Sequence, residues 1–309
     1  MVDDACDRVR RRAYGPPVVD APGDSLAQLR AWASSAFPAQ DWRRAEHHHG
    51  AFHDVLVLPG EVALRAPLGG GGLARATREV GVLRAVEQVS LGVAVPPALS
   101  DVVQHGEQCG YLVGALPGAA EPAPAWPLLR DAFAALLDQL AATSTHLDLP
   151  PPRTWCGGSC FPAVVAPDLL SLLGGCAALA ERAVSALLEL PPPRRPGLVH
   201  GDFGGHNLLW ADGRPSALID WDHACTGDPA TDVAPLVGAH GVAAVSEVVE
   251  DDEVLQRAMV HRATLPLQVA AAAHLAGRWA LRDHALGSFA RRCEEGTLHD
   301  PTGAVPDRW

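Results

Sequence analysis

Short alternating runs of apolar and polar residues dominate the first third of the chain and predict a small sheet. An irregular, proline-punctuated start is followed by Leu26, Leu29 and Trp32 at helical spacing, which predicts a helix over about 25–35. Beyond it, a Pro-Gly turn joins two alternating runs that are typical of an antiparallel pair. The strand-like runs lie at 55–58, 61–66, 98–104 and 110–115, and a helix is expected at 73–88.

The remainder of the chain has a mostly helical pattern. Leucine and alanine recur there at amphipathic spacing over long segments. A stretch rich in proline and alanine at 117–127 separates these segments from the sheet and marks a lobe boundary. We therefore expect an N-terminal lobe over 1–116, with a partly irregular and helical extension at 1–46, and a helical C-terminal lobe over 117–309. The predicted helices lie at 128–144, 178–190, 254–275 and 277–293.

One segment, residues 198–232, concentrates polar side chains among short apolar runs. Two of these runs flank an Asp-Gly turn and predict a β-hairpin over 208–219. Asp202 and Asn207 precede the first strand, and Asp220 follows the second. The three side chains can therefore converge at one rim of the fold.

The spacing of these three groups matches the requirements of phosphoryl transfer. Asp202 can orient an acceptor hydroxyl and take its proton, while Asn207 and Asp220 can hold magnesium ions against nucleotide phosphates. Hard oxygen ligands of this kind suit Mg²⁺. The alternative is that all three are ordinary turn residues, and Asp228, followed by a proline, is equally well explained as a helix cap.

These residues carry a resemblance to a known family. The chain reads HGDFGGHN at 200–207, IDWD at 219–222 and GDPATD at 227–232, which resembles the signature of the aminoglycoside phosphotransferase and choline kinase family. Within that family, the motif GGxNxLW followed by DWD most resembles that of viomycin phosphotransferase-like antibiotic kinases. The resemblance spans about residues 47–290 and implies a two-lobed, protein-kinase-like α/β (α+β) fold, with a small antiparallel sheet in one lobe and helices in the other.

The resemblance also implies roles for individual residues. Asp202 would be the catalytic base, Asn207 and Asp220 would hold Mg²⁺, and Asp232 would brace the catalytic loop. ATP or GTP would be the co-substrate. The lobe over 1–116 would bind the nucleotide, and the lobe over 117–309 would carry the catalytic residues and bind the substrate.

The expected nucleotide contacts depart from the family pattern, in which a strand lysine contacts the phosphates and pairs with a helix glutamate. The chain contains no lysine, and Arg65 stands on the corresponding strand, with Glu79 on the next helix as its expected partner. Arginine stays charged and can bind phosphate through two N–H groups. The alternative is that Arg65 is a strand-edge charge and Glu79 lies on a solvated face. The hinge that would hold the nucleotide base is expected at 113–116, and includes Val113 and Ala115.

Other motifs have simpler explanations than a binding site. The histidine run 47–49 resembles a metal tract, but a solvated loop is favoured, and Gly50 beside it is a weak candidate for the loop that covers the phosphates. The glycines at 69–72 lack the following Lys and Ser or Thr of a phosphate loop and predict a connector. Cys156 and Cys160 are not followed by a second pair with zinc spacing.

Composition narrows the class of protein. Hydrophobic residues make up 48% of the 309 residues and charged residues 19%, which is an ordinary globular balance. The seven cysteines, an odd number, favour reduced thiols, and no apolar stretch predicts a membrane span or a secretion signal, so we expect a cytoplasmic protein. The net charge of −12 argues against nucleic acid as a partner and is compatible with a cationic substrate.

The sequence thus predicts a phosphotransferase that moves the γ-phosphoryl group of ATP or GTP to a hydroxyl of a small, cationic molecule, as a monomer or homodimer. By resemblance the acceptor is an antibiotic, either an aminoglycoside or a viomycin-like peptide. Two alternatives stay open. One is a metabolic kinase acting on an amino alcohol or sugar. The other is a binding protein that kept the fold without the chemistry, an idea that the missing lysine favours and the intact set of Asp202, Asn207 and Asp220 opposes.

Overall fold

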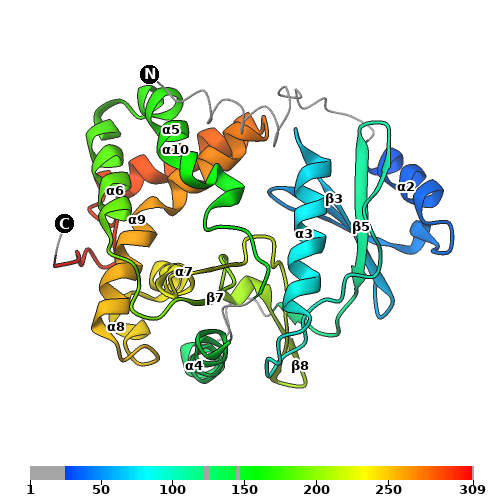
Figure 1. The fold of residues 1–309 in the computed structure, drawn as a ribbon, viewed down its shortest axis with the longest axis horizontal. Coiled ribbons are helices and arrows are strands. Elements are labelled where there is room, and N and C mark those ends of the chain that lie inside the picture. The colour runs from blue at the N-terminus through cyan, green and yellow to red at the C-terminus, as the bar shows by residue number, and fades with distance from the viewer. Residues whose placement is uncertain (1–24, 121–124, 144–146, 308–309) are drawn as a thin grey trace.

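The structure, a computed structural model, describes residues 25–120, 125–143 and 147–307. A sheet with a helix on each face forms one part of the molecule, and a group of helices forms the other (Figure 1). Residues 1–24 of the extension expected to be irregular lie outside the described ranges. Among the described residues, no helix is both long enough and apolar enough to cross a bilayer.

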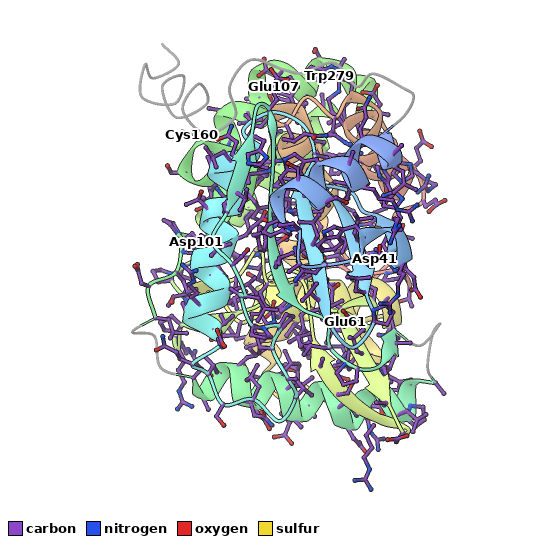
Figure 2. All side chains as sticks on the ribbon, turned by 90° about the vertical axis from the view of Figure 1, so that its right-hand side faces the viewer. Asp41, Glu61, Asp101, Glu107, Cys160 and Trp279 are labelled. Carbon is purple, nitrogen blue, oxygen red and sulfur yellow. The ribbon has the colours of Figure 1, made fainter. Side chains whose placement is uncertain are left out.

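The sheet has five antiparallel strands in the order β1-β2-β3-β5-β4. α2 (Ser25–Ala36) covers one face, where Leu29 and Trp32 pack with Leu56 and Leu64, and Figure 2 shows it lying across the strands. α3 (Gly72–Val86) packs against β3 and β5 on the other face, toward the helical part. The strands are β1 (Glu46–His49), β2 (His53–Leu58), β3 (Val62–Pro67), β4 (Val103–His105) and β5 (Gln108–Gly114).

The helical part is built around α9 (Asp252–Leu275), which contacts α6, α7 and α10. Asp251 caps α9, because its carboxylate accepts the backbone N–H of Glu253 at 2.9 Å. Small alanine side chains near the end of α9 allow its neighbours to approach closely, and these alanines are buried. The other helices are α4 (Trp126–Ala142), α5 (Phe161–Val164), α6 (Ala177–Glu189), α7 (Ala230–His240), α8 (Val242–Val245) and α10 (Trp279–Glu294).

Short helical turns and two small sheets complete the fold. The turns are η1 (Trp42–Arg44), η2 (Thr154–Cys156), η3 (Gly158–Cys160), η4 (Val165–Leu169), η5 (Leu170–Leu172), η6 (Gly174–Cys176) and η7 (Gly205–Asn207). One small sheet pairs β7 (Gly197–Val199) with β10 (Cys225–Gly227), and the other contains β6 (Ala119–Ala120), β8 (Leu208–Ala211) and β9 (Arg214–Leu218).

The two small sheets position the segment 198–232. The loop after β7 runs into η7 and β8, and the loop after β9 leads to β10, which pairs back onto β7. Asp212 and Gly213 form the predicted turn between β8 and β9, both with positive φ (51° and 71°), as a tight hairpin turn requires. The loops that carry Asp202 and Asp220 therefore meet at one side of the helical part.

Most predicted elements are present within a few residues of their expected bounds, including the helices assigned to α2, α3, α4, α6, α9 and α10. The predicted strand at 98–104 is largely wrong. Ala98 makes only an isolated bridge to Val113, and the Ser100 hydroxyl then accepts the N–H of Leu112 at 2.9 Å in place of a ladder bond. The strand proper begins at Val103.

Two further expectations need correction. The histidine run 47–49 is the edge strand β1 rather than a solvated loop. Cys160 is disulfide-bonded, so the expectation that all cysteines are reduced is wrong at that position. The described cysteines that are free thiols are Cys109, Cys156, Cys176, Cys225 and Cys293.

Candidate active site

The loop after β7 is fixed by Asp232, near the start of α7. One carboxylate oxygen of Asp232 accepts the backbone N–H of His200 and the other accepts that of Gly201, both at 2.8 Å. Burial raises the pKa of Asp232 to about 7, while the two N–H donors act to lower it. Gly201 has φ +87°, and a Cβ there would lie 2.5 Å from the backbone oxygen of His223, so only glycine fits. The brace that resemblance implied for Asp232 has a direct geometric basis.

His200 joins this loop to the end of β9. The Nε2–H of its buried ring donates to the backbone oxygen of Ile219 at 2.9 Å, and Nδ1 accepts the backbone N–H of Asp202 at 3.3 Å. Burial lowers the pKa of His200 to about 4, so the ring is neutral near pH 7. The carboxylates of the two loops are therefore held in a fixed relation by an imidazole between their backbones.

Asp202 and Asn207 contact each other directly. The side-chain amide of Asn207 donates to the backbone oxygen of Asp202 at 2.9 Å and to its Oδ2 at 3.2 Å. Nε2 of His206 lies 3.3 Å from the same Oδ2. Burial acts to raise the pKa of Asp202, but the hydrogen bond from His206 holds it below its usual range. Asp202 is therefore an ionised acceptor at neutral pH.

Arg65 on β3 reaches across to the loop after β9. Its Nη2 lies 2.8 Å from Oδ1 of Asp220 and also contacts Oδ2 of Asp222. Asp220 has φ +66°, an uncommon left-handed conformation for aspartate, and its side chain is 40% exposed, whereas that of Asp222 is 7% exposed. This uncommon backbone conformation positions the carboxylate that the resemblance assigned to the metal.

The pKa values of Asp220 and Asp222 are shifted in opposite directions. Burial, together with the nearby charges of Glu79 and Asp220, raises the pKa of Asp222 well above its usual range. Burial also acts to raise the pKa of Asp220, but the charge of Arg65 and a hydrogen bond from Asp222 hold it below its usual range. We infer that Asp222 carries the proton of the pair. Asp220 then keeps the ionised carboxylate that a cation needs.

The predicted direct pairing of Arg65 with Glu79 is replaced by an indirect one. Glu79 on α3 accepts from Tyr111 Oη at 3.0 Å and contacts His53 Nε2 at 2.9 Å, and both of those residues also contact Arg65. Although burial opposes ionisation, the charge and hydrogen bond of His53 lower the pKa of Glu79 to about 2. Glu79 is buried, so a solvated helix face is excluded for it. The glutamate thus supports Arg65 through an imidazole and a phenol.

These groups surround one cavity of about 390 Å³. The loop 50–52 between β1 and β2 forms part of its wall, and Trp155 and apolar residues of α9 form another part. Trp155 packs against His223 with ring centroids 4.3 Å apart and ring planes tilted by 36°. The arginines and carboxylic acids among the lining residues are Arg65, Arg75, Arg78, Glu79, Asp202, Asp220 and Asp222.

Three predicted site residues do not line this cavity. Asn207 reaches it only through its contact with Asp202. Val113 is a buried β5 residue paired with Ala63, and the N–H of Ala115 donates to Glu61 at 3.5 Å. The predicted hinge therefore lies at the end of β5, outside the cavity that holds Asp202.

Sequence reasoning missed Arg78 and gave no role to His53, Tyr111 or Asp222. Arg78 lines the cavity, and within the described part of the chain its guanidinium has no ion pair. Its only sequence signal is its place one residue before Glu79 on α3. The other three contact Arg65 because distant segments of the chain pack together, and local sequence patterns do not predict such contacts.

Asp228 is both a helix cap and part of a buried cluster, so the cap alone does not describe it completely. One oxygen accepts the N–H of Ala230 at the start of α7 at 3.0 Å, and the other contacts Arg257 at 2.6 Å and His261 at 3.0 Å. Burial acts to raise the pKa of Asp228, but the hydrogen bonds from His261 and Arg257 hold it below its usual range. Asp228 joins α7 to α9 rather than lining the cavity.

Comparisons with known proteins agree with this geometry. A model of the phosphotransferase enzyme family matches residues 46–265. Viomycin phosphotransferase of Streptomyces vinaceus is 33% identical over 251 residues, which cover 72% of this chain and 84% of that protein.

Solved structures share the fold at low identity. The GDP complex of wild-type aminoglycoside 2′-phosphotransferase-IIIa matches with a TM-score of 0.67 and 15% identity, over 87% of this chain and 100% of that one. Macrolide 2′-phosphotransferase MphH from Brachybacterium faecium matches with a TM-score of 0.57 and 20% identity, over 85% and 97% of the two chains. The predicted two-lobed, kinase-like fold is confirmed.

Proposed function

This chain belongs to the phosphotransferase enzyme family, and from that membership we propose that it transfers the γ-phosphoryl group of ATP or GTP to a hydroxyl of a small cationic antibiotic. The observation that carries the proposal is that Asp202 and Asp220, from two separate loops, line the same cavity as Arg65. Phosphoryl transfer needs these three charges close together, because its catalysis rests on positioning and electrostatic stabilisation.

Asp202 is the proposed catalytic base. Its carboxylate is ionised at neutral pH, is oriented by the amide of Asn207 and faces the cavity. An acceptor hydroxyl that donates to this carboxylate is held with its oxygen toward the γ-phosphorus. As the new P–O bond forms, the hydroxyl proton passes to Asp202, and the bond from the γ-phosphorus to the β–γ bridging oxygen breaks, which releases ADP or GDP.

The residues present fit a magnesium ion. Asp220 is an ionised and half-exposed carboxylate on the cavity wall, and Asn207 adds an amide close by, a hard oxygen set that Mg²⁺ favours. When bound, Mg²⁺ supplies positive charge beside the nucleotide phosphates. Asn207 and Asp220 are the residues proposed to hold it.

Two arginines are proposed to take over the phosphate contacts of the missing lysine. Arg65 is held by Asp220, Asp222 and Tyr111, so its planar guanidinium is fixed before a nucleotide arrives. Arg78 on α3 lines the same cavity and has no ion pair among the described residues. A guanidinium can bind phosphate through two parallel N–H groups, which suits both positions.

The proposed acceptor is a viomycin-like cyclic peptide or an aminoglycoside. The 33% identity to a viomycin phosphotransferase favours the peptide. The net charge of −12 and the carboxylates on the cavity wall favour a polycation over a neutral sugar. Phosphorylation would reduce the positive charge of the drug, and resistance is the expected consequence in a cell that makes the protein.

The test is a coupled phosphotransfer assay of the purified chain with ATP and with GTP, in Mg²⁺. The acceptors are viomycin, capreomycin, kanamycin, hygromycin B, choline and glucose. The proposal expects acceptor-dependent turnover on at least one cationic antibiotic and none above background on choline or glucose. Turnover on choline or glucose alone would assign a metabolic kinase instead, and nucleotide binding without turnover on any acceptor would support a binding protein.

A further inference from the structure

A histidine pair and an aspartate meet on the β1–β2 hairpin, away from the cavity. His49 and Asp54 are direct cross-strand partners, and His47 lies two residues earlier on the same strand face. Nε2 of His47 lies 2.9 Å from Oδ1 of Asp54, and Nδ1 of His49 lies 2.7 Å from the same oxygen. The three ligand atoms all lie within 4.8 Å of one another.

This cluster and the cavity occupy opposite faces of the sheet. Asp54 alternates with His53 and Val55, both of which line the cavity. Asp54 pairs instead with Ala66, on the face that α2 covers and that Figure 2 presents to the viewer. The cluster therefore has no part in the site proposed for phosphoryl transfer.

Asp54 is a partly buried carboxylate in contact with two imidazole rings. Its side chain is only 11% exposed, and its Oδ1 contacts a ring nitrogen of both His47 and His49. A partly buried carboxylate is costly unless a positive charge is near. A divalent ion held between the two ring nitrogens and the carboxylate would supply that charge.

The spacing is also close to that of a metal site. Bonds of about 2.0–2.1 Å from zinc to nitrogen or oxygen, in a tetrahedron, put neighbouring ligand atoms roughly 3.3 Å apart. The two hydrogen-bond distances of 2.9 and 2.7 Å would need to lengthen by only a few tenths of an ångström. The side chain of His49 is 59% exposed, so an ion can enter and keep a water molecule as its fourth ligand.

We propose that His47, His49 and Asp54 form a binding site for a divalent transition metal ion of the Zn²⁺ class. Two imidazoles and one carboxylate favour such ions over Mg²⁺, which takes oxygen ligands. His49 and Asp54 lie on either side of the β1–β2 turn, which is closed by a 2.8 Å hydrogen bond from the N–H of Gly50 to the backbone oxygen of His53. A bound ion thus ties together the two strand ends from which the cavity loop emerges.

The experiment is a calorimetric titration of the untagged full chain, freed of metal with chelator, with Zn²⁺ alone. His49→Gln removes one ligand nitrogen, and glutamine can still donate to Asp54. His48→Gln is the matched control, because His48 is the adjacent histidine on the opposite strand face, 62% exposed. Circular dichroism confirms that each variant is folded.

We expect one tight Zn²⁺ per chain, weakened roughly tenfold or more in His49→Gln and unchanged in His48→Gln. Co²⁺ should give the visible absorption of a tetrahedral site in the wild type and in His48→Gln only. Zn²⁺ should raise the unfolding temperature of the same two proteins. Zn²⁺ affinity that is equal in His49→Gln and the wild type, or no saturable binding at all, would overturn the proposal whatever the acceptor assay shows.

Discussion

Replacing Asp232 by asparagine tests the brace of the catalytic loop with a change of a single atom. In the wild type each carboxylate oxygen accepts one backbone N–H at 2.8 Å, from His200 and from Gly201. Asparagine keeps one acceptor but turns an NH₂ group toward the second N–H. Because the side chain is 1% exposed, no water can separate the two donors.

The expected loss of stability follows from two buried N–H donors that would lack an acceptor. A buried hydrogen-bonding group left without a partner costs about 1–3 kcal/mol, so one backbone N–H and one amide N–H together cost about 2–6 kcal/mol of unfolding free energy. The loop should also shift, because two N–H donors cannot stay at hydrogen-bonding distance from each other. A misplacement of about 1 Å at a reacting group costs roughly 100-fold in rate, so kcat should fall by about that factor.

The assay is urea unfolding followed by circular dichroism, with kcat measured where both proteins are folded. Asp212→Asn is the matched control, because Asp212 is exposed in the β8–β9 turn and asparagine tolerates its positive φ of 51°. The control should stay within about 0.5 kcal/mol of the wild type. An Asp232→Asn protein with wild-type unfolding free energy and kcat would refute the brace.

Three further substitutions probe the rest of the site. Asp220→Ala should weaken Mg²⁺-dependent nucleotide binding in calorimetry, and unchanged binding would show that another group holds the metal. Arg78→Gln should raise KM for the nucleotide about tenfold with little change in stability, because the Arg78 guanidinium has no ion-pair partner among the described residues. Arg84→Gln, on the same helix but paired with Asp101 at 2.7 Å, is the control and should leave KM unchanged. Because the pKa of His200 is lowered from 6.5 to about 4, the free energy of unfolding should fall by up to about 3 kcal/mol as pH falls from about 6.5 to 4. In urea unfolding, His200→Asn should flatten this pH dependence, and an equally steep loss in the variant would assign it to other groups.

The parts of the fold that follow local periodicity could be predicted from the sequence. The amphipathic spacing of Leu29 and Trp32 gave α2, and the Asp-Gly turn gave the β8–β9 hairpin. The irregular stretch from η2 to η6 was not predicted, since its short turns depend on packing against α6 and α9 rather than on any period. The run 47–49 is predicted as a loop because three consecutive histidines show no apolar alternation, whereas the structure pairs it with β2.

Some residues of the candidate site could likewise be predicted from the sequence and others could not. Asp202, Asn207 and Asp220 could be proposed because they lie within one segment, where spacing carries information. Tyr111 is 46 residues from Arg65 along the chain, and their 3.0 Å contact arises only when β5 pairs with β3. The sequence therefore indicates the reacting groups better than the residues that tune and support them.

The most direct test of the central claim compares the wild type with Asp202→Ala in one experiment. Each protein is incubated with viomycin, Mg²⁺ and nucleotide, phosphorylated product is detected by mass spectrometry, and nucleotide binding is measured in parallel. We predict phosphorylated antibiotic from the wild type, and a loss of roughly 100-fold or more in rate with near-normal nucleotide binding in Asp202→Ala. Equal turnover by the two proteins would contradict the assignment of Asp202 as the catalytic base.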